Sequence, residues 1–271
     1  MGGTEKFGHV QTMSDVTLLC IHGYPLDHRM WGPLAERLER VRACHVVAPD
    51  LRGRGSSRWP PADVHAMSLL ADDLAADMKS LVPGDAPFLL CGLSMGGYVS
   101  FEFLRRHGGR LRKRLKGLVL CDTKAAPDDD AGRAKRKEAI EAIRRNGIGA
   151  AFEAMAPKLL SPKSKGTSAE TLVREMILGT PPATAAADLA GLALRSDGFD
   201  VLGAFDRPVL VVCGDDDAIT PVADAEAIAA ACQNAPFVRL LTVPKAGHMA
   251  PLENPDDVAG AIVDLISRLP A

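Results

Sequence analysis

The sequence predicts an α/β fold: a mostly parallel central sheet with helices on both faces, interrupted by one helical insertion. Short, almost continuous apolar runs alternate with helical segments over most of the chain, which is typical of parallel strands covered on both faces. From about residue 124 to residue 206 the strand patterns stop and only helical patterns remain. We therefore predict a core made of residues 1–123 and 207–271, with residues 124–206 inserted as a helical lid.

The composition narrows the functional classes. The chain has 271 residues, 47% of them hydrophobic, and a formal net charge of −2, which does not favour binding to nucleic acid or to an acidic membrane surface. The polar N-terminus lacks the apolar segment of a signal peptide, and no apolar run approaches the length of a membrane span. The six cysteines include no CxxC pair, so we interpret them as buried apolar residues in a reducing, cytoplasmic compartment.

In the first half of the chain, apolar runs predict four strands after a weakly patterned leader. Residues 1–15 are expected to hold at most one or two short edge strands. The four strands are expected at residues 16–21, 45–48, 88–91 and 118–121. Helical patterns predict helices at 30–41, at 67–82 and from 98 to about 107.

The second half begins with the lid and then returns to alternating strands and helices. Lid helices are expected up to Arg145 and then near 148–160, 168–179 and 184–195, separated by Pro, Gly and Ser. Strands are expected at 208–213 and 237–243, with a helix near 222–233 between them. A last helix is predicted after Asn254, because Asn254 can cap it and Pro255 suits its first position.

The stretch around Ser94 carries the main functional signal. The apolar run at 88–91 leads directly into Gly92-x-Ser94-x-Gly96 and then into a helical segment. A strand that turns straight into a helix bends sharply and needs small residues two positions before and after the bend, as Gly92 and Gly96 provide. This pattern predicts a nucleophile elbow, which projects the Ser94 hydroxyl above the sheet edge. The alternative is a helix start with packing glycines and an incidental serine, because the motif alone is common.

A serine hydroxyl is a weak nucleophile and needs a base, which in turn needs an orienting acid. Of the seven histidines, His248 is the candidate base, because it lies in a loop directly after the last predicted strand. The acidic run 215–217 follows the strand at 208–213, so one of its residues fits the chain order Ser, Asp, His that such an elbow implies. Asp122, which ends the strand before the lid, is the rival acid.

The third requirement is an oxyanion hole. The N–H of Met95, directly after the expected nucleophile, would supply one donor. The loop His22-Gly23-Tyr24-Pro25 after the first clear strand would supply the other, and we expect this donor to be the N–H of Tyr24. His22 is expected to hold the loop in place by hydrogen bonding.

Together these motifs resemble the α/β-hydrolase superfamily over roughly residues 16–269. The matching motifs are His22-Gly23-Tyr24-Pro25, Asp50-Leu51-Arg52-Gly53-x-Gly55-x-Ser57, the elbow at 92–97, Gly214-x-x-Asp217-x-x-Thr220-Pro221 and Gly247-His248-x-x-x-x-Glu253-x-Pro255. In that family the acid is the fourth residue of the Gly-x-x-Asp loop, so the resemblance implies Asp217. The lid-bearing esterases and enol-lactonases look most similar. Relatives often carry His where this chain has Arg54.

We therefore expect a serine hydrolase of carboxylic esters or lactones that uses Ser94, His248 and Asp217, with the N–H groups of Tyr24 and Met95 as oxyanion donors. The expected partner is a small-molecule ester or lactone, and no metal or organic cofactor is required. A C–C or amide-bond hydrolase with the same residues is an alternative, as is a non-catalytic receptor of this fold. The sequence does not predict the oligomeric state.

The lid is expected to set substrate choice and to contribute little to the chemical step. Its apolar residues would either line an acyl pocket or form the lid core, and the second is the commoner case. Its basic residues would either attract an acidic substrate or form a solvated helix face, and we favour the solvated face. These two sets are Phe152, Met155, Leu159, Leu160, Met176 and Ile177, and Arg133, Lys135, Arg136, Lys137, Arg144 and Arg145.

Overall fold

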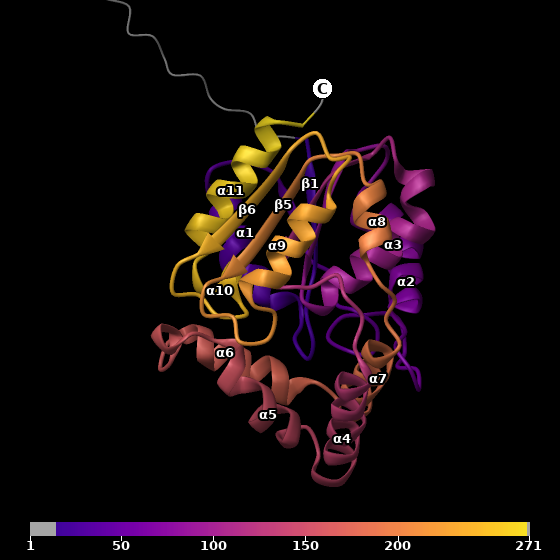
Figure 1. The fold of residues 1–271 in the computed structure, drawn as a ribbon, viewed down its shortest axis with the longest axis vertical. Coiled ribbons are helices and arrows are strands. Elements are labelled where there is room, and N and C mark those ends of the chain that lie inside the picture. The colour runs from indigo at the N-terminus through magenta and orange to yellow at the C-terminus, as the bar shows by residue number, and fades with distance from the viewer. Residues whose placement is uncertain (1–14, 270–271) are drawn as a thin grey trace, which may run out of the picture.

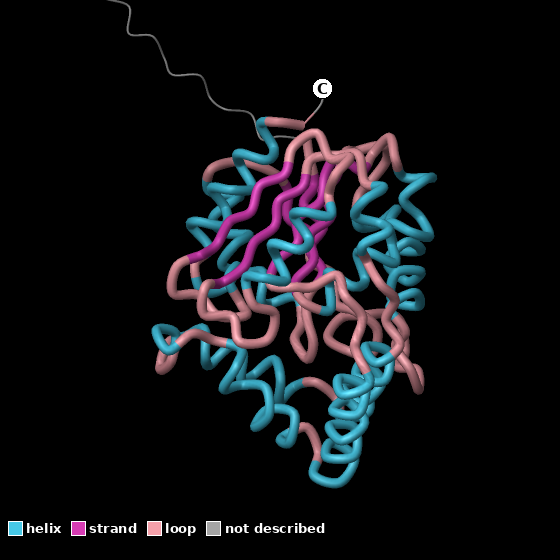
Figure 2. Tube along the Cα trace, in the orientation of Figure 1, coloured by secondary structure: helices cyan, strands magenta, loops and turns pink. Residues whose placement is uncertain are grey.

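The computed structural model describes residues 15–269, which form one twisted sheet with helices on both faces (Figures 1 and 2). Within this range the sheet has six strands, and every neighbouring pair is parallel. Their order across the sheet is β2 (His45–Val47), β1 (Thr17–Ile21), β3 (Phe88–Leu93), β4 (Leu115–Cys121), β5 (Val209–Gly214) and β6 (Val238–Val243). The predicted parallel sheet is thus confirmed, while the edge strands expected before residue 15 lie outside the described residues.

Consecutive strand residues point alternately into two apolar cores, one on each face of the sheet. On one face the strands pack against α2 (Met67–Leu81), α3 (Met95–Leu111) and α9 (Val222–Ala231). On the other face they pack against α1 (Gly32–Arg40) and α11 (Pro255–Ser267). The strand residues Leu18 and Leu19 enter opposite cores and are fully buried, which stabilises the fold by about 1.5–3 kcal/mol for each such side chain.

The helix ends follow local signals in the sequence. Asn254 caps α11 as predicted, because its side chain accepts a hydrogen bond from the Asp257 N–H at 3.4 Å and Pro255 takes the first helical position. Two short helices that the sequence did not predict precede longer ones. They are the 3-10 helix η1 (His28–Trp31) before α1, and α10 (Ala250–Glu253) before α11.

Between β4 and β5, in the segment that the sequence analysis interprets as a lid, the described chain contains helices and loops but no strand. The helices are α4 (Asp130–Asn146), α5 (Gly149–Leu159), the 3-10 helix η2 (Pro162–Ser164), α6 (Ser168–Gly179), α7 (Pro182–Ala193) and α8 (Phe199–Ala204). Figure 1 places α4 to α7 below the carboxyl ends of the strands, at the foot of the view. The short α8, which the sequence did not predict, packs against α3 and α9 beside the sheet.

The side chains of the lid range from fully buried to exposed. Leu159, Met176 and Ile177 are fully buried in the apolar core that lies on the α1 side of the sheet. Phe152 and Met155 are half-buried, and Met155 packs against both cores. The basic residues of α4 agree with a solvated face, since four of them are exposed: Lys135, Lys137, Arg144 and Arg145.

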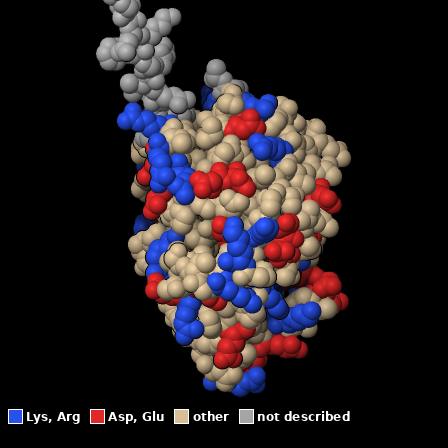
Figure 3. Space-filling model, turned by 90° about the vertical axis from the view of Figure 1, so that its left-hand side faces the viewer, with Lys and Arg blue, Asp and Glu red and all other residues tan. Residues whose placement is uncertain are grey.

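The surface and the cysteines also bear on the predictions from composition. On the face drawn in Figure 3, acidic and basic side chains are interspersed. None of the helices in the described part of the chain combines the length and apolar character that a membrane span needs. All six cysteines are buried and unpaired, as predicted. Burial also raises the pKa of the Cys91 thiol well above its usual value, which keeps it in the unreactive thiol form.

Candidate active site

Ser94 occupies the sharp bend between β3 and α3 that the sequence predicts. Its backbone has φ 51° and ψ −114°, a conformation that residues with a side chain rarely adopt. The bend requires glycine on both sides. A Cβ atom at Gly92 would lie 2.4 Å from the Gly96 carbonyl oxygen, and one at Gly96 would lie 2.1 Å from the Ile21 carbonyl oxygen. Packing of α3 against β1 therefore fixes the bend.

Hydrogen bonds hold the Ser94 backbone from three directions. Its N–H donates to the Cys121 carbonyl at the end of β4, at 3.0 Å. Its carbonyl accepts from the Gly97 N–H at 2.9 Å and from the Thr123 hydroxyl at 2.8 Å. The half-buried side chain thus stands at the amino end of α3, where the helix dipole favours negative charge.

His248 and Asp217 form a buried hydrogen-bonded pair beyond the ends of β6 and β5. The Nδ1 atom of His248 lies 2.8 Å from Oδ2 of Asp217, and both side chains are at most 2% exposed. The Asp217 carboxylate also accepts from the N–H groups of Ile219 at 2.8 Å and Thr220 at 3.0 Å, and from the Thr220 hydroxyl at 2.8 Å. These bonds fix the carboxylate and, through it, the plane of the imidazole.

The electrostatics of this pair favour its charged form. Burial alone would raise the pKa of Asp217, but the hydrogen bond and charge of His248 and the two backbone N–H groups outweigh it, so the pKa is lowered. Burial alone would lower the pKa of His248, but the hydrogen bond and charge of Asp217 outweigh it, so the pKa is raised. The imidazole is therefore a stronger base than a free histidine.

Asp122, the rival acid, lies in a different arrangement. Its two carboxylate oxygens accept from the backbone N–H groups of Gly214 at 2.9 Å and Ala250 at 3.0 Å. The residue is fully buried, and burial together with the nearby charge of Asp217 raises its pKa to about 7. Asp122 therefore ties the end of β4 to the end of β5 and to the loop that carries His248. Asp215 and Asp216 are exposed.

The loop formed by residues 22–26, here called the oxyanion loop, lies directly against Ser94. A Cβ atom at Gly23 would be 3.3 Å from Cβ of Ser94. His22 holds the loop as predicted, because Nδ1 donates to the Gly23 carbonyl at 2.9 Å while Nε2 accepts from the Leu51 N–H at 3.0 Å. Burial and then the charge of Arg54 lower the pKa of His22 to about 4, which keeps the ring neutral in this role.

The two expected oxyanion donors lie on either side of this contact. Tyr24 belongs to the oxyanion loop, and Met95 begins α3. Within residues 15–269, neither N–H donates a hydrogen bond to a protein acceptor. Both N–H groups are therefore available to an oxygen atom bound beside Ser94.

Glu253 is a residue of the site to which the sequence assigned no role. Its Oε1 accepts from the Gly247 N–H at 2.7 Å, next to His248. Its Oε2 accepts from the N–H of Ser161 at 2.9 Å and from the hydroxyls of Ser161 at 2.7 Å and Ser164 at 2.6 Å. One carboxylate thus joins the His248 loop to the lid. The sequence could have pointed to this role, because Glu253 belongs to the motif that begins at Gly247 and contains His248.

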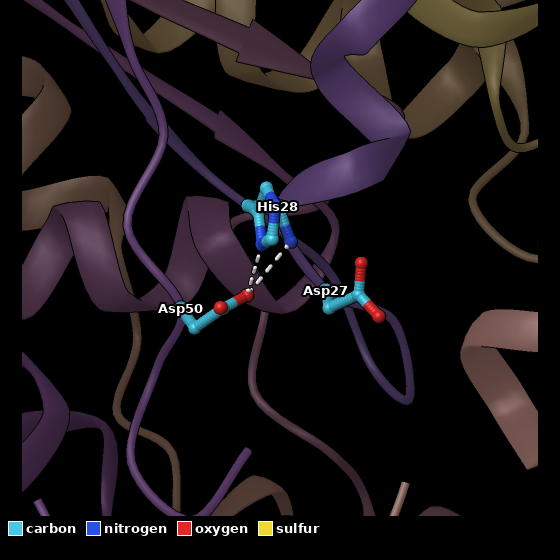
Figure 4. A group of neighbouring side chains, drawn as sticks. All are labelled: Asp27, His28 and Asp50. Atoms are coloured by element: carbon cyan, nitrogen blue, oxygen red, sulfur yellow. Dashed lines mark hydrogen bonds and ion pairs between the residues drawn. The ribbon is translucent and has the colours of Figure 1, made fainter. Parts of the chain in front are cut away.

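Two groups of Asp, His or Cys side chains have the spacing of metal ligands within the described residues. Asp27, His28 and Asp50 form one, in which Asp50 Oδ1 accepts from the His28 backbone N–H at 3.0 Å and lies 2.8 Å from its Nδ1 (Figure 4). The Asp27 carboxylate turns away from this pair and accepts from Arg29. The second group is buried and combines the two bonded carboxylates described above, Asp122 and Asp217, with Cys213, whose thiol donates to the Gly214 carbonyl at 3.3 Å and to the Thr220 carbonyl at 3.4 Å. Both groups are explained by hydrogen bonds that fix loops, so neither motivates a metal site.

Comparisons with known proteins bear on the fold and the enzyme class. The family model described as "Alpha/beta hydrolase family" matches residues 18–261. The chain is 26% identical to the pimeloyl-[acyl-carrier protein] methyl ester esterase of Chromobacterium violaceum, over 92% of this chain and 93% of that protein. The protein of the same name from Neisseria meningitidis is 28% identical, over 91% of each chain.

Two solved structures are informative. The thermophilic esterase of Thermogutta terrifontis has a TM-score of 0.83 and 39% identity, over 95% of this chain and 91% of that chain. The enol-lactonase of Burkholderia xenovorans has a TM-score of 0.79 but only 22% identity, over 97% of this chain and 94% of that chain, so it bears on the fold alone. The relatives named here are thus ester hydrolases, which agrees with the enzyme class that the sequence predicts.

Proposed function

The chain belongs to the alpha/beta hydrolase family, and from this premise we propose that it hydrolyses carboxylic esters or lactones with Ser94 as nucleophile, His248 as base and Asp217 as orienting acid. Ester hydrolysis is supported by the names of the relatives, which are esterases. The residue roles are supported by the geometry at the carboxyl edge of the sheet, where ligands of such folds bind.

The observation that carries the proposal is the bend at Ser94. A serine held at φ 51° between two glycines that tolerate no Cβ presents its hydroxyl clear of the helix and the strand. Conformations of this kind cost roughly 1–3 kcal/mol and persist where the surrounding structure enforces them, which is a mark of functional sites. A packing serine would not require this conformation.

The proposed reaction gives each of these groups one task. Ser94 Oγ attacks the carbonyl carbon while His248 Nε2 accepts its proton, and the N–H groups of Tyr24 and Met95 bind the developing oxyanion. The intermediate collapses, and His248 returns the proton to the departing alkoxide, leaving an acyl group on Ser94. Water, deprotonated by His248, then attacks the acyl-enzyme, and His248 passes the proton to Ser94 Oγ as the bond to the acyl group breaks and the acid leaves. Asp217 stabilises the imidazolium that forms in both steps.

Both substrate classes in the proposal present the same reacting group. A lactone is an internal ester, so its alcohol stays attached to the acyl group after the first step. The relatives from Chromobacterium violaceum and Neisseria meningitidis are named for methyl esters, which supports esters with a small alcohol. A panel of aryl esters, methyl esters and lactones compares the two classes directly.

The test of the mechanism is Ser94→Ala. We expect the variant to lose nearly all ester turnover and to keep the unfolding temperature of the wild type or exceed it, because the substitution removes only a half-buried hydroxyl. Ser100→Ala is the matched control. Ser100 is also a serine near this bend, in α3, but its hydroxyl donates to the Gly96 carbonyl at 2.8 Å and has no role in the proposed reaction. Turnover near the wild-type level in a pure preparation of Ser94→Ala would refute the mechanism.

A further inference from the structure

The lid holds the oxyanion loop at two consecutive carbonyl groups. The Thr180 hydroxyl, at the end of α6, donates to the Pro25 carbonyl at 2.9 Å. The guanidinium of Arg54 donates from Nη1 to the Leu26 carbonyl at 2.8 Å, and from Nη2 to the Asp188 carboxylate on α7. Asp188 therefore acts on the oxyanion loop through Arg54.

The ion pair between Arg54 and Asp188 is buried, with side chains 2% and 1% exposed. In the part of the chain that the structure describes, the Nε–H of Arg54 has no hydrogen-bond partner. Burying such a pair is a poor way to gain stability, because desolvation offsets the attraction and the unpaired donor adds a further penalty. The pair is better explained by a positional role, because the terminal nitrogens of Arg54 join the Leu26 carbonyl to the Asp188 carboxylate.

Asp188 is itself fixed in place by the core. Its Oδ1 lies 2.7 Å from Nδ1 of His65, and His65 Nε2 accepts from the Ala62 N–H at 3.1 Å, so Nδ1 carries the proton and donates to Asp188. Helix α7 approaches this segment without a gap. A Cβ atom at Gly191 would lie 1.8 Å from the His65 carbonyl oxygen. The position of α7 thus determines the position of Asp188.

We propose that Arg54 and Asp188 are positioning residues that set the Tyr24 N–H in the oxyanion hole, so that the lid takes part in the chemical step. This inference rests on the proposed function. An oxyanion donor is effective only about 2.7–3.1 Å from the developing charge. Arg54 fixes the carbonyl of Leu26, two residues after Tyr24, and its rigid fork joins that carbonyl to α7. The expectation that the lid sets only substrate choice is thereby modified.

The test compares esters of increasing acyl length in Asp188→Asn. We expect kcat to fall by about 10- to 100-fold, the scale of a misplaced catalytic group, by the same factor for acetyl, butanoyl and hexanoyl esters and with little change in KM. The acid limb of the pH profile should not move, since His248 and Asp217 keep their contacts. Thr180→Val removes one neutral hydrogen bond to the same loop and should give a smaller uniform loss of about 3- to 10-fold.

Asp73→Asn is the matched control. Asp73 accepts from Arg52 at 2.7 Å and 2.6 Å, so this variant breaks an ion pair of the same 50–57 segment. Within residues 15–269, neither side chain of this pair forms a hydrogen bond to the lid or to the oxyanion loop. The variant should keep wild-type kcat per folded molecule. Arg54→Lys keeps the charge beside Asp188 but has no fork, so we expect it to share the uniform kcat loss.

The outcomes separate the inference from the proposed function. Turnover by wild type and Asp73→Asn, with a uniform kcat loss in Asp188→Asn and Thr180→Val, supports both. Ordinary kcat in Asp188→Asn or Arg54→Lys, or losses that change with acyl length, overturns the inference and leaves the proposed function intact. Absence of ester turnover in the wild type overturns both.

Discussion

Two residues with positive φ stand side by side at the carboxyl edge of the sheet. Ser94 has φ 51° and Asp122 has φ 45°, and the N–H of Ser94 bonds to the carbonyl just before Asp122. Each conformation costs roughly 1–3 kcal/mol and is enforced by its contacts. In our account Ser94 bears the nucleophile, while Asp122 supports the loops from β5 and β6 through Gly214 and Ala250. Two aspartates of one site thus have separate roles.

The roles of the two aspartates give the first prediction at this scale. Asp217→Asn should lower kcat by about 10⁴-fold, because an amide favours the wrong imidazole tautomer. Asp122→Asn should lower it far less, because Asp122 contacts backbone N–H groups rather than the imidazole. Kinetics of the two variants on one aryl ester decide the matter, and a larger loss in Asp122→Asn would reverse the assignment.

The same pair predicts the pH dependence. His248 must be neutral to accept a proton, and its pKa is raised above the ordinary value of about 6.5. Activity should therefore fall as the pH drops through a value above 6.5. In Asp217→Asn the raising hydrogen bond and charge are gone, so the acid limb of the residual activity should shift to lower pH. A limb that stays in place would show that another group controls the profile.

At the scale of the element, the catalytic loops are held from both sides. The core supports them through His22 and Asp122. The lid supports them through its contacts with two core residues: its serines bond to Glu253, and its Asp188 bonds to Arg54. Local patterns predicted most helices and strands, since caps, glycines and apolar spacing act over a few residues. They indicated the support from His22 but did not reveal the supports from the lid, because residues such as Arg54 and Asp188 are 134 positions apart and meet only when α7 packs against the core.

The lid also supplies a prediction about substrate choice. Met155 is half-buried and packs against both apolar cores, so this lid side chain lies between them. Met155→Ala should reorder the preference among acyl chains, by about 1–3 kcal/mol per methylene, while acetyl ester turnover changes little. Met176 is fully buried, so Met176→Ala should instead cost about 2–5 kcal/mol of stability.

The readout for Met155 is kcat/KM across acetyl to octanoyl aryl esters, with Met176→Ala as the comparison in a thermal unfolding experiment. An equal loss on every ester in Met155→Ala would place this side chain among the groups that support the chemistry. If Met176→Ala changes the order of acyl-chain preference and leaves the stability unchanged, Met176 lines the acyl pocket and the assignment of Met176 to the lid core is wrong.

At the scale of the whole molecule, the parallel sheet explains why a sequence could indicate the site. The carboxyl ends of parallel strands meet at one edge, so residues that follow β1, β3, β5 and β6 gather there although they span more than 200 positions. The glycine motif around Ser94, together with chain order and strand ends, was therefore sufficient to select Ser94, His248 and the acidic residues 122 and 215–217 as candidates. The choice between Asp217 and Asp122 needed the family pattern, since both follow strands.

Covalent labelling tests the central claim most directly. An alkyl fluorophosphonate transfers its phosphonyl group to an activated serine oxygen with loss of fluoride, and the adduct is located by mass spectrometry of the digested protein. We predict one phosphonyl group per molecule, on the peptide that contains Ser94, with loss of ester turnover in proportion to labelling, and much slower labelling of His248→Ala. A fully active protein with no adduct on Ser94, or an adduct on another residue that tracks the loss of activity, would contradict the account.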